Sequence, residues 1–93
     1  MERKYEFTEE TTNTDGAILH RIKAVRDFGD VKKGDVGGFI EKEENLSHDG
    51  IAWVYGRARV YGNTRISGNV HIHGDVRIYG NARISGNAGI YSM

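Results

Sequence analysis

The chain has 93 residues, no cysteine and no proline, and its 13 Lys and Arg balance 13 Asp and Glu. This length predicts one domain, and the lack of cysteine excludes a disulfide framework and a thiolate metal site. The sequence has no apolar signal stretch and no run near the ~18 apolar residues of a membrane span, so we expect a cytoplasmic protein that does not enter a membrane.

The balanced charge hides two unlike halves. Residues 1–50 hold eight Lys and Arg against twelve Asp and Glu, whereas residues 51–93 hold five Arg and a single acidic residue, Asp75. The first half is therefore acidic, and the second half is basic through arginine alone.

The N-terminal segment predicts a β-hairpin. Residues 4–8 and 18–25 have strand-like patterns, and residues 12–16 between them contain the Asp-Gly pair that favours tight hairpin turns. Residues 31–38 follow as a glycine-rich bend, interpreted as a turn because the Lys-Ser/Thr of a phosphate loop is missing. We find no motif for a cofactor.

Residues 1–50 are interpreted as a cap on the second half, and residues 51–93 as a repeat region of about two coils in the same structural domain. Phe39, Ile40 and Leu46 are the apolar residues expected to cover the first coil. Regular coiling is expected to begin near Ile51.

The second half repeats every six residues. Glycine recurs at the end of each hexad, at Gly50, Gly56, Gly62, Gly68, Gly74, Gly80 and Gly86. From the hexad that ends at Gly56 onward, the residue two positions before the glycine is Val or Ile. Such a period is typical of a β-solenoid, in which each hexad is a short strand that alternates inward and outward side chains. The glycines are expected at corners, because glycine adopts positive φ freely.

Three strands and three corners predict a triangular coil of 18 residues, so that outward residues at i and i+18 stack. The sequence supports this, since equal or similar residues recur at that spacing. One face carries Trp53, Tyr55, His71, His73 and Tyr91, the second carries Arg59, Tyr61, Arg77 and Tyr79, and the third carries Arg65, Ser67, Arg83 and Ser85.

These hexads resemble the left-handed parallel β-helix of the hexapeptide-repeat superfamily, and the combination with residues 27–41 and 45–47 resembles the YdcK-like family. The resemblance implies an all-β fold: a short left-handed parallel β-helix with three strands per coil and an N-terminal β-hairpin cap. It also implies a frequent phage or prophage origin, and it brings no established catalytic residues.

The second face combines positive charge with aromatic rings, as proteins that bind single-stranded nucleic acid do. Arg59, Tyr61, Arg77 and Tyr79 are therefore candidate binding residues, with Arg65 and Arg83 beside them on the third face. The structural alternative is that arginine stems cover apolar surface and that Tyr suits an exposed strand.

His71 and His73 form a weak candidate metal site, because two imidazoles at i and i+2 share a face and can bind zinc. Only Asp75 stands near as a third ligand, so exposed histidines in a stack are the alternative. Related acyltransferases use a histidine as general base between subunits, which would make this chain a reduced enzyme of that kind. We predict no metal, no cofactor and no catalytic residue.

The last hexad leaves a strand edge that nothing in the sequence blunts with Pro, Lys or a helix. Ala88, Ile90 and Tyr91 are therefore expected to form the edge of a homo-oligomer, and a lateral trimer is the competing geometry. The overall prediction is a non-catalytic binding or assembly module. The alternatives are a phage inhibitor of a host defence protein or its nucleic acid, and the acyltransferase-like enzyme.

Overall fold

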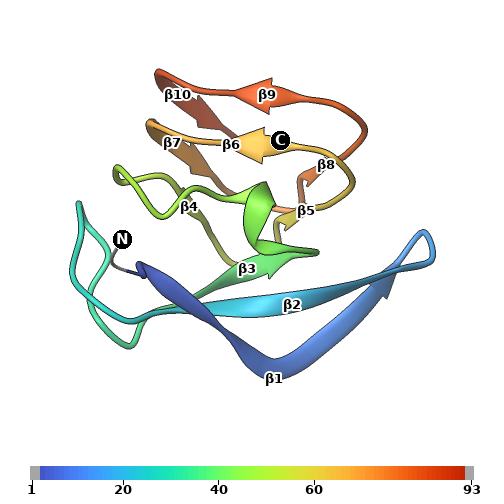
Figure 1. Ribbon diagram of the computed structural model, residues 1–93, viewed down its shortest axis with the longest axis horizontal. Helices are drawn as coiled ribbons and strands as arrows, with labels where there is room; N and C mark the ends of the chain where they lie inside the picture. The colour runs from blue at the N-terminus through green and yellow to red at the C-terminus, as the bar shows by residue number, and fades with distance from the viewer. Residues whose placement is uncertain (1–2, 92–93) are drawn as a thin grey trace.

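The computed structural model describes residues 3–91, and the regular secondary structure in this range is almost entirely β (Figure 1). The elements in chain order are β1 (Tyr5–Thr14), β2 (Ala17–Ala24), β3 (Val36–Ile40), the 3-10 turn η1 (Glu43–Asn45), β4 (Trp53–Val54), β5 (Arg59–Val60), β6 (Arg65–Ile66), β7 (Asn69–Ile72), β8 (Arg77–Ile78), β9 (Arg83–Ile84) and β10 (Asn87–Ile90). No helix in this range is long and apolar enough to cross a membrane.

The predicted hairpin is present, with longer strands than expected. β1 and β2 pair antiparallel, and only Asp15 and Gly16 form the turn, both with positive φ (52° and 86°). A two-residue turn of this kind matches the twist of the flanking strands, so the polar residues before it continue β1. In Figure 1 the hairpin lies across the base of the solenoid and extends beyond it.

The bend predicted over residues 31–38 is wrong in its second part, because Val36–Ile40 forms strand β3. β3 pairs antiparallel with β2 and parallel with β5, so it joins the hairpin sheet to the solenoid. A Cβ at Gly37 would lie 2.6 Å from the Val54 carbonyl oxygen, and one at Gly38 would lie 2.6 Å from the Ala58 carbonyl oxygen. The two glycines therefore permit close packing. β3 starts an irregular first coil, in which Phe39 pairs with Arg59 at a spacing of 20, and the regular spacing of 18 begins with Trp53 and His71, close to the expected Ile51.

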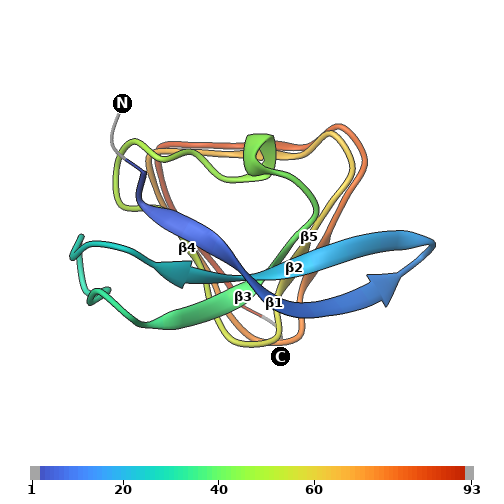
Figure 2. The same cartoon turned by 60° about the horizontal axis from the view of Figure 1, so that its bottom comes forward.

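The solenoid has the predicted triangular cross-section, which Figure 2 shows nearly along its axis. Its three sides are β4, β7 and β10; β3, β5 and β8; and β6 with β9. The pairs β5–β8, β6–β9 and β7–β10 are parallel and join residues 18 apart, as in Arg59 with Arg77 and Arg65 with Arg83. All seven repeat glycines have positive φ, between 58° and 83°, which confirms their place at corners.

The core runs along the inside of the coils and is densest near the cap. The predicted inward residues from Ala52 to Ile72 are buried, whereas their equivalents from Val76 to Ile90 are only half-buried. Ile40 and Leu46 cover the first coil as expected. Trp53 was expected to face outward, but it is 1% exposed because Phe28 and Tyr5 pack edge-on against its ring.

Candidate functional site

The solenoid aligns its arginines in two ladders. Arg59 and Arg77 lie in register on neighbouring parallel strands, and Arg65 and Arg83 do the same on the next side of the triangle. Neighbouring strands lie about 4.8 Å apart. Each ladder therefore holds two positive side chains side by side, as the 18-residue spacing predicts.

The arginine–tyrosine face consists of Arg59, Tyr61, Arg77 and Tyr79. The tyrosine rings stack, with centroids 5.3 Å apart and an interplanar angle of 16°. Tyr79 is 61% exposed, but Tyr61 is only 6% exposed because Leu19 and Phe39 pack against it. Its hydroxyl donates a hydrogen bond to Asp15 Oδ2 (2.6 Å), which raises the pKa of Tyr61. Tyr61 therefore anchors the hairpin tip, and the accessible groups of this face are Arg77, Tyr79 and part of Arg59.

None of the four ladder arginines forms an ion pair within residues 3–91. The ion pairs found there involve the cap: Arg3 with Glu43 and Arg21 with Glu10. Like charges directly opposite each other on neighbouring strands destabilise a sheet. An anion bound between stacked arginines would remove this repulsion, so the ladders are suited to bind one.

A groove lies beside the second ladder. It has a volume of about 430 Å³, and it is lined by Lys42, Glu44, Asn63, Thr64, Arg65, Asn81 and Arg83. We call it the arginine groove. The predicted residues Arg65 and Arg83 form part of its wall, whereas Lys42 and the two asparagines were not predicted. The turn η1, which follows Lys42, lies along the side of the triangle formed by β6 and β9 (Figure 2).

The histidine pair is built into an aromatic stack. His73 lies between the rings of Tyr55 (4.2 Å) and Tyr91 (4.9 Å), nearly parallel to both. His71 shares hydrogen bonds with the Tyr55 hydroxyl (3.1 Å) and with Asn69 Oδ1 (3.0 Å). Burial, and to a lesser extent the neighbouring His71, lower the pKa of His73. Within residues 3–91 no three His, Cys, Asp or Glu side chains are grouped to hold a metal ion.

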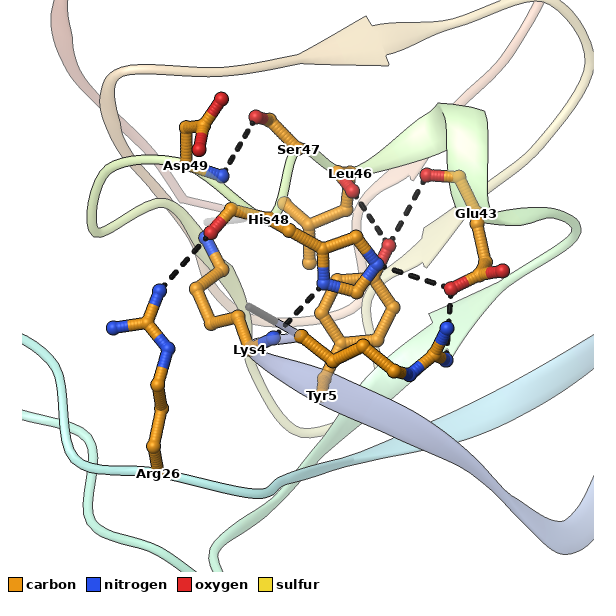
Figure 3. Close-up of polar contacts among 9 residues, drawn as sticks. Lys4, Tyr5, Arg26, Glu43, Leu46, Ser47, His48 and Asp49 are labelled. Atoms are coloured by element: carbon orange, nitrogen blue, oxygen red, sulfur yellow. Dashed lines mark hydrogen bonds and ion pairs between the residues drawn. The ribbon is translucent and has the colours of Figure 1, made fainter. Parts of the chain in front are cut away.

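A polar cluster that the sequence did not reveal fastens the start of β1 to the first coil (Figure 3). His48 stacks on Tyr5 (4.2 Å), accepts a hydrogen bond at Nδ1 from the Lys4 backbone N–H (2.9 Å), and therefore donates from Nε2 to Glu43 (3.0 Å). This bond and the Arg3 guanidinium hold the pKa of Glu43 below its usual value. The Tyr5 hydroxyl donates to the Leu46 carbonyl oxygen (2.5 Å). Because the polar groups of this cluster form hydrogen bonds with one another, we interpret the cluster as structural.

The predicted oligomer edge lies in β10 and the residue after it. Within residues 3–91 β10 pairs with β7 alone, Ala88 and Ile90 are half-buried, and Tyr91 is 66% exposed. The upper side of the last coil is therefore uncovered by the part of the chain that is described.

The triangular coil, whose three sides are stacks of parallel strands, defines the class of this protein as a short β-solenoid. Comparison with protein families agrees: the family described as "YdcK Beta solenoid repeat" matches residues 52–68, 58–74 and 76–92. The second half of the chain is thus a β-solenoid whose repeats are similar to those of the YdcK family.

Among curated proteins, the chain is similar to one named "Uncharacterized acetyltransferase YdcK" from Escherichia coli (strain K12). The two are 38% identical over 61 residues. The match spans 57% of this chain and only 19% of the relative.

Proposed function

We propose that the protein is a non-catalytic cytoplasmic β-solenoid module that binds an anionic partner through its arginine–tyrosine face. The observation that carries the proposal is the ladder of Arg59 and Arg77, which stacks two positive charges without an ion pair within residues 3–91. The rest of the solenoid adds to the same positive field, because the second half of the chain has five Arg and one Asp.

Single-stranded nucleic acid fits this face best. The ladder places arginines where successive phosphates can contact them, and the exposed Tyr79 offers a ring on which a base can stack. The family resemblance implies a phage or prophage origin. A module from that source would meet host nucleic acid, and an acidic surface of a host defence protein is the alternative partner.

The test is binding to a heparin column and to a labelled thymidine oligonucleotide. The variant Arg59→Glu with Arg77→Glu should lose retention, and wild-type affinity should fall steeply with salt, because binding to phosphates releases counterions. Lys32→Glu with Lys33→Glu is the matched control, since it makes the same charge change on exposed residues of the cap.

Two results would contradict the proposal. One is a wild-type protein that is not retained on heparin and does not bind the oligonucleotide at about 50 mM salt. The other is equal loss of binding in the ladder variant and the control variant, because this would show a dependence on net charge alone.

Acetyl transfer is the second candidate function, and it rests on the name of the Escherichia coli relative. The lowered pKa of His73 favours the neutral imidazole that a general base needs. Both faces of its ring are covered by Tyr55 and Tyr91, however, which leaves the ring edge as the accessible part. Release of thiol from acetyl-coenzyme A that disappears in His73→Ala would replace the binding proposal with this one.

A further inference from the structure

The arginine groove exists because η1 interrupts the column below Arg65. Leu46 forms a parallel bridge with Ile66, so the segment after η1 occupies the place of a strand beneath β6. The residue before it, Asn45, is fully buried and donates from its side chain to the backbone oxygens of Thr64 (2.9 Å) and Gly62 (3.2 Å). The ladder of Arg65 and Arg83 therefore has no third arginine, and Lys42 and Glu44 lie at that end of the groove instead.

The hydrogen bonds along the groove turn its polar groups in one direction. Lys42 Nζ donates to Asn63 Oδ1 (3.3 Å), and Asn63 Nδ2 donates to Asn81 Oδ1 (3.2 Å). Because its oxygen is already engaged, Asn81 has its side-chain N–H groups left to donate. Together with Lys42, Arg65 and Arg83, the groove thus offers mainly donors and positive charge, and Glu44 is the one carboxylate in its lining.

We propose that this groove binds the phosphate group of a small molecule, either inorganic phosphate or a phosphate monoester. Arginine recognises tetrahedral oxyanions through two parallel N–H donors, and two guanidinium groups on strands about 4.8 Å apart can share one such ion. The volume of about 430 Å³ lies in the range of small-ligand sites. A long polyanion fits less well, because the ladder has two arginines and η1 lies at its lower end.

This site goes beyond the proposed function and does not depend on it. It uses Arg65 and Arg83 on one side of the triangle, whereas the proposed nucleic-acid surface uses Arg59 and Arg77 on another. Either site can therefore fail in experiment while the other stands.

The experiment is calorimetric titration of the 93-residue chain with inorganic phosphate and with glycerol 3-phosphate, at constant ionic strength set with chloride. Saturable binding of one ligand per chain is expected, and Arg83→Gln should weaken it at least tenfold. Arg57→Gln is the matched control, because it removes the same charge from an exposed arginine that lies in neither ladder and does not line the groove. Its affinity should stay within twofold of the wild type.

Glu44→Gln gives a test of opposite sign. The carboxylate repels an anion in the groove, so its removal should tighten phosphate binding severalfold, an outcome that loss of structure cannot imitate. If glycerol 3-phosphate binds more tightly than inorganic phosphate, the ligand is an ester, and the reverse order identifies free phosphate.

Three results would overturn the proposal. These are no saturable binding of either probe, equal weakening by Arg83→Gln and Arg57→Gln, and weaker binding in Glu44→Gln. Binding of an oligonucleotide at the groove without binding of either small phosphate would also overturn it, since the site would then recognise a polymer.

Discussion

Lys4 is a charged side chain in an apolar place. It is fully buried, its Nζ donates to the Ala52 carbonyl oxygen (2.8 Å), and it lies 5.0 Å from the centre of the Phe28 ring. Burial, and to a lesser extent the nearby Arg26, lower the pKa of Lys4 to about 8. The unfolded chain has no such environment, so there the pKa stays near 10.5.

This difference predicts that Lys4 makes the protein more stable as pH rises from about 8 to about 10.5. Over that range the unfolded state keeps a proton that the folded state has lost, and stability rises with pH wherever the unfolded state binds more protons. Relative to Lys4→Met, the wild type should gain about 1–2 kcal/mol between pH 7 and 9.5, because one pKa unit corresponds to about 1.4 kcal/mol.

Urea unfolding followed by the fluorescence of Trp53, the one tryptophan of the chain, measures both proteins. The series should end near pH 9.5, because burial raises the pKa of Tyr5. A raised tyrosine pKa makes the folded protein less stable once the pH exceeds the ordinary pKa of tyrosine, and this effect would oppose that of Lys4. Parallel pH curves for wild type and Lys4→Met would show that Lys4 has no depressed pKa.

At the scale of the element, β3 determines how closely the cap approaches the solenoid. Gly38→Ala places a methyl group 2.6 Å from the Ala58 carbonyl oxygen and 2.8 Å from a Val54 methyl group, and neither can move without shifting the coil. We expect a loss of about 1–3 kcal/mol of stability, the usual cost of overpacking.

The matched substitution is Val36→Ala on the same strand, whose side chain is 53% exposed and whose loss should change stability by less than about 0.5 kcal/mol. Urea unfolding of both variants makes the comparison. Equal stabilities would mean that the cap does not sit as closely on the coil as β3 indicates.

The same strand shows why part of the fold was predictable from the sequence and part was not. The coils and corners are predictable because each hexad contains its own glycine, and this glycine adopts the positive φ that the corner requires. Gly37 and Gly38 look like a turn in the sequence. Glycine is needed there because the backbone approaches Val54 and Ala58 closely, and those residues lie 16 or more positions further along the chain, where a local pattern does not reveal the contact.

The candidate sites divide in the same way. The ladders of Arg59 with Arg77 and Arg65 with Arg83 follow from the period of 18, and the structure confirms their register. The burial of Tyr61 and the arginine groove depend on where non-repeating segments, the hairpin tip and η1, come to lie. A repeat pattern contains no information about those positions.

At the scale of the whole molecule, the two ends of the solenoid differ. The hairpin sheet covers the first coil, whereas within residues 3–91 nothing covers the inward side chains of the last one, so Ile78, Ile84 and Ile90 remain half-buried. The equivalent residues one coil earlier, Val60, Ile66 and Ile72, are at most 1% exposed. We propose that two copies of the chain pair through this uncovered coil and form a homodimer.

The prediction is that Ile90→Lys converts the 93-residue chain from dimer to monomer in light scattering. Pairing would bury Ile90 against the partner coil, and an unpaired ammonium group buried there costs more than the contact contributes. Ser85→Lys is the control, because it adds the same charge at an exposed, outward position of the same coil and should leave the dimer intact. Trp53 fluorescence checks that both variants are folded.

A lateral trimer is the competing geometry. It would use the face of Tyr55 and His73 without Trp53, because the cap already covers Trp53, and it would persist in Ile90→Lys. A wild-type chain that stays monomeric at high concentration would exclude both arrangements.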